Sequence, residues 1–125
     1  ELLDRGNVHD QSKLAEPEVA LFTKLTEKLS GLTYGSPEYK ESLKELGPAL
    51  EHHYAKNRHH TEHYSNGIEG MNLVDIIELF CDWKAATERH HDGNLLKSIK
   101  HNAGRYNINS QLVKIFENTA DFIEQ

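Results

Sequence analysis

The sequence lacks several features that would assign a protein to a class at once. It has a single cysteine, Cys81, so no intrachain disulfide can form, and a lone thiol fits a reducing cytoplasm. No apolar run approaches the roughly 20 residues that a membrane span needs. No basic-then-apolar stretch resembles a signal peptide. We therefore expect a cytoplasmic location and no membrane partner.

Positive charge is also scarce. The 14 Lys and Arg residues are outnumbered by 20 Asp and Glu residues, which gives a net charge of −6 with neutral histidines. This balance argues against nucleic acid as the main partner. A small phosphorylated molecule could still bind if cations bridge it to the protein. At 125 residues with 37% hydrophobic residues, the chain can bury one core, so we expect a single domain over residues 1–125.

Hydrophobic spacing predicts an all-α fold of about five to seven helices. No stretch shows the sustained period-two alternation of a strand, whereas apolar residues recur at helical spacing. Cap-plus-proline signals begin helices near residues 16 and 36, and Gly47-Pro48 should break the second of these. Further helices are expected over about 72–89, 95–104 and 109–123. In the last of these helices, the side chains expected to face the core are Leu112, Ile115, Phe116, Ala120 and Ile123.

The most unusual stretch is HHYAKNRHHTEH, residues 52–63, which contains five of the nine histidines. Clustered imidazoles disfavour one another when charged, but neutral imidazole is a common metal ligand. If the stretch is helical, His53, Asn57 and His60 share one face, and His52, His59 and His63 share another. The alternatives are a metal site with some bystander histidines, or a solvated, histidine-rich surface helix.

Carboxylates in two other places could complete a metal site. Asp82 lies in the middle of the most hydrophobic helix, where an acid is costly unless it is paired or bound to metal. Asp75 in the same helix has a structural explanation, because Asn72 can cap the helix with an acid three residues later. His9-Asp10 offers an imidazole and a carboxylate from consecutive residues, although the pair could simply form a turn and helix cap.

Taken together, these motifs resemble the HD-domain metal-dependent phosphohydrolases. HDQSK at residues 9–13 is similar to their His-Asp-x-x-Lys segment, and DWKAA at residues 82–86 is similar to their late aspartate helix. The paired histidines resemble those of the binuclear, cyclic-dinucleotide-cleaving branch. More closely, the chain resembles a family of small, uncharacterised bacterial and phage proteins that share HDxSK, NxHHxEH and a late DW. The resemblance implies a single, compact HD-like helical bundle.

The resemblance also implies a ligand set for one or two divalent transition metal ions, chosen among Mn, Fe, Co, Ni and Zn. His9, Asp10 and Asp82 would converge on the first ion. Asp10 would bridge to a second ion held by His53, His59 or His60. The remaining histidines would lie at the edge or outside the site: His63, His90, His91 and His101.

The implied function is hydrolysis of a nucleotide or another small phosphate ester, in which metal ions activate water and neutralise phosphoryl charge. Asp10 and Lys13 would be catalytic, since an ammonium at residue 13 can offset developing charge. Substrate-binding roles would fall to Lys13, Asn57, Arg58 and Glu78, with Arg105 as another candidate for steering. The alternatives are a non-catalytic nucleotide-binding or sensing HD-like module and an HD-type di-iron oxygenase.

The first superfamily ligand, a histidine on a preceding helix, has no counterpart before His9. Glu1 to Arg5 resembles the last turn of a helix that Gly6 closes. We therefore expect the natural chain to extend upstream and to carry a histidine about four or more turns before His9. Apolar surface that such a helix would cover could otherwise favour a homo-oligomer.

Overall fold

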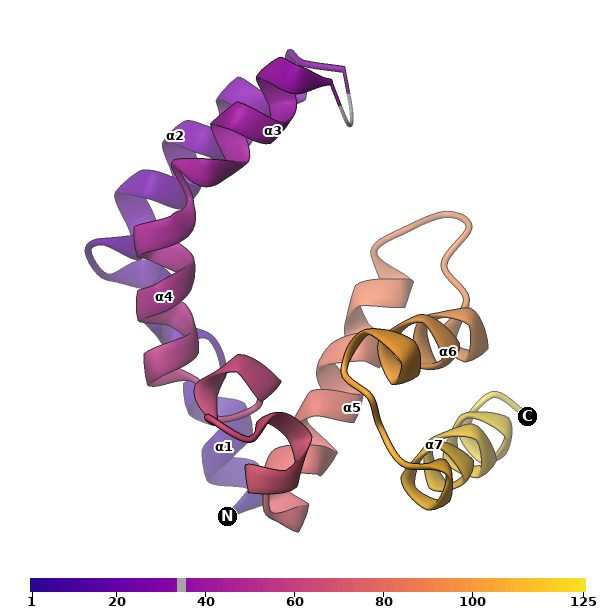
Figure 1. Ribbon diagram of the computed structural model, residues 1–125. Helices are drawn as coiled ribbons and strands as arrows, with labels where there is room; N and C mark the ends of the chain where they lie inside the picture. Colours follow the sequence, from indigo (N-terminus) through magenta and orange to yellow (C-terminus); the bar gives the residue numbers. More distant parts are fainter. Residues whose placement is uncertain (34–35) are drawn as a thin grey trace. The chain divides into compact units, whose positions relative to one another are not determined.

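The chain is all-helical, as predicted. A computed structural model describes residues 1–33 and 36–125 and contains no strand among them (Figure 1). Its α-helices are α1 (Leu2–Val8), α2 (Glu18–Ser30), α3 (Pro37–Lys44), α4 (Gly47–Lys56), α5 (Leu73–Glu88), α6 (Leu95–Arg105) and α7 (Ser110–Ile123). Short 3-10 helices are η1 (Gln11–Leu14), η2 (Thr61–His63) and η3 (Gly67–Gly70). Within this described part, none of the helices is long and apolar enough to cross a membrane.

The chain divides into two compact units. One comprises Leu3–Arg58, and the other comprises His59–Gln125 with Glu1–Leu2. We call them the N-terminal and C-terminal units and describe each by itself. The prediction of one HD-like domain over residues 1–125 stays a prediction.

Two helix starts follow their sequence signals. The side chain of Ser36 accepts a hydrogen bond from the Tyr39 backbone N–H at 3.1 Å and so caps α3. Asn72 and Asp75 form a complete capping box at the start of α5, which confirms the structural explanation of Asp75. Each side chain satisfies a backbone N–H that the first helical turn leaves without an intrahelical partner.

In the N-terminal unit, α2 packs against α3, α4 and η1, and Leu25 and Ala49 are fully buried (Figure 1). The break predicted at Gly47-Pro48 separates α3 from α4, with the proline in the first turn of α4. The expectation that Gly6 closes a helix is wrong, because α1 continues through it to Val8. A glycine that closes a helix in the left-handed conformation has a positive φ, and among the described glycines only Gly67 has one.

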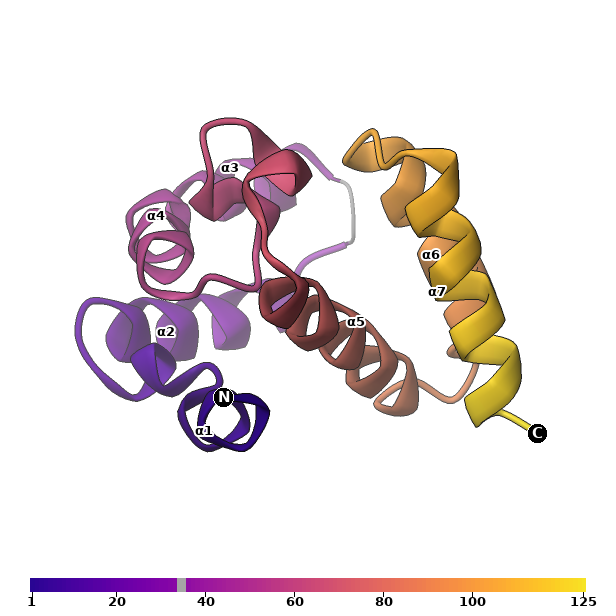
Figure 2. The ribbon, with the colours of Figure 1, turned by 90° about the horizontal axis from the view of Figure 1, so that it is seen from below.

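In the C-terminal unit, α6 packs against both α5 and α7, and Figure 2 shows α6 and α7 side by side. Aromatic rings join α5 to α7: Phe116 stacks on Phe80 at 5.6 Å between ring centroids and meets Trp83 edge-on at 5.3 Å. These contacts lie in one hydrophobic core, whose buried members are Leu79, Phe80, Trp83, Leu95, Ile99, Ile108, Phe116 and Ala120. The core therefore depends on side chains from all three helices.

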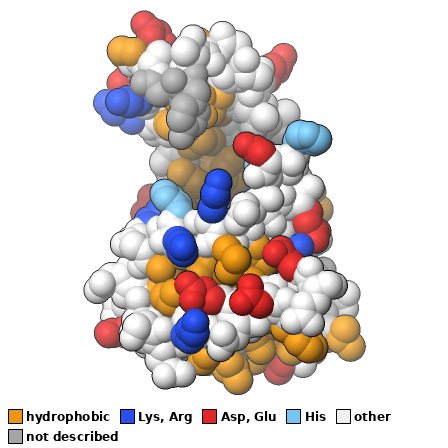
Figure 3. Space-filling model, turned by 90° about the vertical axis from the view of Figure 1, so that its right-hand side faces the viewer, with side chains coloured by type: hydrophobic (Ala, Val, Ile, Leu, Met, Phe, Trp, Pro, Cys, Tyr) orange, Lys and Arg blue, Asp and Glu red, His pale blue; other side chains and the backbone are white. Residues whose placement is uncertain are grey.

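Two of the five side chains predicted to face inward on α7 do not. Ile115 and Ile123 are 50% and 45% exposed, whereas Phe116 and Ala120 are buried. One stripe of the helix, at spacings of four residues, is enough to contact α5 and α6, and the flanking positions stay in solvent. Figure 3 shows hydrophobic side chains exposed between charged ones on the face that it displays. Exposed apolar residues are common on protein surfaces.

Gly93, between α5 and α6, gives a stability prediction. A Cβ at this position would lie 1.8 Å from the Thr87 carbonyl oxygen, a backbone atom that cannot move aside alone. Gly93→Ala should lower the free energy of unfolding by about 2 kcal/mol. Gly104→Ala is the matched control, because a Cβ there meets nothing within 4 Å inside α6. Gly104→Ala should raise the free energy of unfolding by about 0.5–1 kcal/mol, because alanine favours a helix interior more than glycine does. Urea unfolding measures both, and equal effects would contradict the prediction.

Candidate metal-binding residues

The histidine stretch is helical only in its first half. Helix α4 ends at Lys56, Asn57 is extended with a φ of −122°, and His60 is also extended. His53 and His60 therefore do not share a helical face, and the helical grouping is wrong for residues beyond Lys56. The boundary between the two units also falls inside this stretch, after Arg58.

Asp10 is the centre of the candidate ligands in the N-terminal unit. Its carboxylate lies 3.5 Å from His9 Nε2 and 3.4 Å from His53 Nε2, and it accepts a hydrogen bond from Lys13 Nζ at 3.0 Å. Asp10 adopts a left-handed conformation with a φ of 55°, just before η1. Aspartate and asparagine tolerate this region better than most other residues. This turn brings the carboxylate of Asp10 close to the imidazoles of His9 and His53, which are 44 residues apart in the sequence.

His53 is held on its other side by Glu18, a carboxylate in the first turn of α2. Both side chains are almost completely buried, and Glu18 Oε1 lies 2.7 Å from His53 Nδ1. Burial alone would lower the pKa of His53, but its hydrogen bonds with Asp10 and Glu18 outweigh this and raise it. Burial alone would raise the pKa of Glu18, but hydrogen bonds from His52, Ser12 and His53 lower it. The pair is therefore stabilised in its charged form when no metal is present.

His59 is the centre of the candidate ligands in the C-terminal unit. It is buried, its Nδ1 lies 3.2 Å from Glu78 Oε1, and its ring lies 4.1 Å from that of His60. A ligand atom of Asp82 lies within 4.8 Å of one of His59. The sequence therefore selected an aspartate and a histidine that do lie near each other within one unit.

Each unit brings together groups that could bind a metal ion. Ligand bonds of about 2.0–2.2 Å allow two ligand atoms of one ion to lie up to roughly 4 Å apart. The distances around Asp10 fit this limit, and His59 and Asp82 come within a small side-chain movement of it. Mixed imidazole and carboxylate ligands suit a divalent transition metal. The convergence of Asp10 and Asp82 involves residues of different units and stays a prediction.

The predicted substrate-binding residues have different surroundings. Lys13 is half-exposed and paired with Asp10, so its ammonium is beside the candidate ligands. Asn57 is buried and uses its amide hydrogens on Ser12 Oγ and the His53 carbonyl, both at 2.8 Å. Arg58 and Arg105 are exposed, and Glu78 contacts His59. Direct substrate contact by any of these residues stays a prediction.

The histidines assigned outside the site are also outside the core. His90, His91 and His101 are exposed, and His63 is partly buried against the Tyr64 ring at 4.7 Å. His52, which was not predicted as a ligand, is bound to the second oxygen of Glu18 at 2.5 Å.

Sequence reasoning missed Glu18. An acid in the first turn of a helix normally has an adequate explanation in the helix dipole and in solvent exposure. The sequence carries no signal that His52 and His53, 34 and 35 residues later, both contact it. The packing of α2 on α4 supplies that information.

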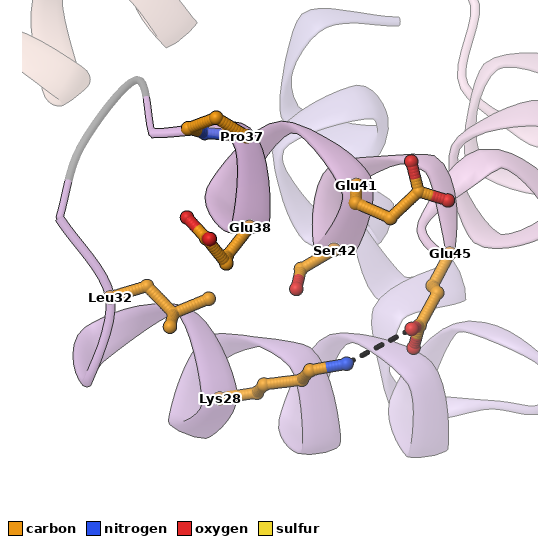
Figure 4. Close-up of a pocket in the computed structure, with 7 residues that line it drawn as sticks. All are labelled: Lys28, Leu32, Pro37, Glu38, Glu41, Ser42 and Glu45. Atoms are coloured by element: carbon orange, nitrogen blue, oxygen red, sulfur yellow. Dashed lines mark hydrogen bonds and ion pairs between the residues drawn. The ribbon is translucent and has the colours of Figure 1, made fainter.

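A surface pocket between α2 and α3 contains none of the predicted ligands (Figure 4). Lys28 crosses it to bind Glu45 at 3.0 Å, and this ion pair lowers the pKa of Glu45. The residues that line it are Lys28, Leu32, Pro37, Glu38, Glu41, Ser42 and Glu45. Three glutamates would repel a phosphorylated ligand, so we do not assign this pocket to the site.

One comparison with known proteins gave a match. The model of a family described as "Family of unknown function (DUF5662)" matches residues 1–125. No curated protein and no solved structure matches the chain.

Proposed function

We propose, from the premise that the chain belongs to this family of unknown function, that it is a metal-dependent phosphohydrolase of nucleotides or other small phosphate esters. The observation that carries the proposal is the surroundings of Asp10. Two imidazole nitrogens and one ammonium lie within 3.5 Å of its carboxylate. Such a group combines ligands for a metal with a cation for a phosphate. The resemblance of HDQSK and DWKAA to HD-domain motifs supports the same reading.

The site would hold one or two divalent transition metal ions. Their ligands would be His9, Asp10, His53, His59, His60 and Asp82. When bound, these ions would supply Lewis acidity and lower the pKa of water. Because the net charge is −6, these cations would offset the repulsion between the protein and a phosphorylated substrate. The lone Cys81 supports a cytoplasmic location for such chemistry.

The residues of the chain have separate roles in this reaction. Water attacks phosphorus, the bond to the ester oxygen breaks, and the proton lost by water ends on the leaving oxygen. Lys13 places its ammonium 3.0 Å from the Asp10 carboxylate, where it can offset charge on the phosphoryl oxygens. Asp10 thus orients Lys13 and would also bind the metal. Asn57 would help to hold His53 in place, because its amide donates hydrogen bonds to Ser12 Oγ and to the His53 carbonyl.

The test is phosphate release from a panel of nucleotides and p-nitrophenyl phosphate, with metal-free protein supplemented in turn with Mn²⁺, Co²⁺ and Ni²⁺. We expect hydrolysis that depends on the metal and that EDTA abolishes. His59→Ala should abolish it, whereas His90→Ala, which changes an exposed histidine, should not. Nucleotide binding without phosphate release would favour a sensing module. Oxygen consumption with a visible iron chromophore would favour an oxygenase.

A further inference from the structure

Glu18 is an unusual residue for its position. It is a carboxylate with 0% exposure at the start of a helix that otherwise presents charged side chains to solvent. An isolated buried carboxylate is strongly destabilising, so it persists only where hydrogen bonds compensate for its lost hydration. Here His52 Nδ1 lies 2.5 Å from one oxygen and His53 Nδ1 lies 2.7 Å from the other.

The hydrogen-bond inventory around His53 decides which ring nitrogen carries its proton. Asn57 has two amide hydrogens, and both are used on Ser12 Oγ and on the His53 carbonyl. The Nδ1 of His53 therefore receives no hydrogen from Asn57, although this nitrogen and the Asn57 amide nitrogen are 3.2 Å apart. The Ser12 hydroxyl is 3.3 Å from Nδ1, but it donates its hydrogen to Glu18. The short contact with Glu18 requires Nδ1 to be the donor, because an ionised carboxylate only accepts.

The second ring nitrogen, Nε2, faces the carboxylate of Asp10, which is itself a candidate metal ligand. Charged His53 carries a hydrogen on both ring nitrogens. The Nδ1 contact with Glu18, at 2.7 Å, is shorter than the Nε2 contact with Asp10 Oδ1, at 3.4 Å, so the single hydrogen of the neutral ring stays on Nδ1 and Nε2 keeps a lone pair. Metal-binding histidines commonly donate their other N–H to a carboxylate, which fixes the tautomer and the ring orientation and makes the ligand more basic.

We propose that Glu18 is a positioning residue that holds His53 as the Nδ1–H tautomer, with Nε2 directed to the metal beside Asp10. The inference rests on the proposed function, since it takes His53 as a ligand. His52 occupies the other oxygen of Glu18 and prevents the carboxylate from rotating away. The first histidine of the His52-His53 pair is thus a support, and the second is the ligand.

Two measurements test this inference. Long-range proton–nitrogen NMR of the metal-free chain, at alkaline pH where the imidazole is neutral, should show His53 with its hydrogen on Nδ1. Co²⁺ titration of Glu18→Gln should then show an affinity about 10–100-fold lower than that of the wild type, with loss of the single tautomer. Glu18→Asp keeps the charge at a shorter reach and should recover part of the affinity. Glu16→Gln, an exposed acid two residues earlier, should change neither quantity.

The outcomes separate this inference from the proposed function. Hydrogen on Nε2 in the wild type would overturn the positioning role without any variant that could misfold. If His53→Ala lowers Co²⁺ affinity while Glu18→Gln retains both the affinity and the tautomer, only the role of Glu18 is overturned. If His53→Ala leaves Co²⁺ affinity unchanged, His53 is not a ligand, and both the inference and the ligand set of the proposed function fail.

Discussion

Asp10→Asn should lower Co²⁺ affinity by more than the roughly 10–100-fold that loss of a second-sphere partner costs. The carboxylate lies within 3.5 Å of two imidazole nitrogens, and an amide lacks both its charge and one of its acceptor oxygens. Asparagine is the informative substitution because it tolerates the φ of 55° at this position, whereas alanine would add backbone strain. Isothermal titration measures the affinity, and metal-dependent phosphate release should fall in parallel.

The matched control is Asp121→Asn on the exposed surface of α7. It removes the same charge far along the chain from the ligand motifs and should leave the affinity unchanged. Loss of the Lys13 ion pair in Asp10→Asn costs at most about 1 kcal/mol, since surface pairs contribute little. The variant should therefore remain folded by circular dichroism. Wild-type affinity in folded Asp10→Asn would remove Asp10 from the ligand set.

Phe116→Ala should lower the free energy of unfolding by about 3–5 kcal/mol. The ring is 3% exposed and contacts both Phe80 and Trp83, so its removal leaves a cavity between α5 and α7. Loss of two aromatic contacts adds to the lost burial of the ring. A loss of this size is a large part of the total stability of a small domain. Urea titration followed by Trp83 fluorescence measures it directly.

Phe122→Ala on the same helix is the control, because that ring is 75% exposed. Its loss should change the free energy of unfolding by no more than about 0.5 kcal/mol. The two variants remove the same atoms and differ only in burial. If they destabilise the chain equally, the core described for the C-terminal unit is incorrect.

The helices could be predicted from the sequence because their signals are local. Capping by Ser36 and by the Asn72–Asp75 box depends on residues three positions apart, which remain neighbours in any helix. Burial on one helix face was less predictable. Ile115 and Ile123 have the same hydropathy as buried residues, and only the packing partners decide that they stay exposed.

The candidate site was likewise predictable from the sequence only in part. HDQSK and the late aspartate selected residues that now lie near other ligand types, such as Asp10 beside His53 and Asp82 near His59. The second half of the histidine stretch was misjudged because histidine spacing alone does not show where a helix ends. Glu18 was missed because its role arises from a contact between two helices, which no local pattern encodes.

Glu18 also has a consequence for how the N-terminal unit opens. It joins η1 through Ser12 and α4 through His52 and His53 to the start of α2. If α4 moved slightly, the carboxylate would lose its donors before water could replace them, and such intermediate states are costly. Partial separation of α4 from α2 is therefore unfavourable, and we expect η1, α2 and α4 to open and close as one cooperative unit. A buried polar cluster would thus set the cooperativity of this unit, whose described residues include few fully buried apolar side chains.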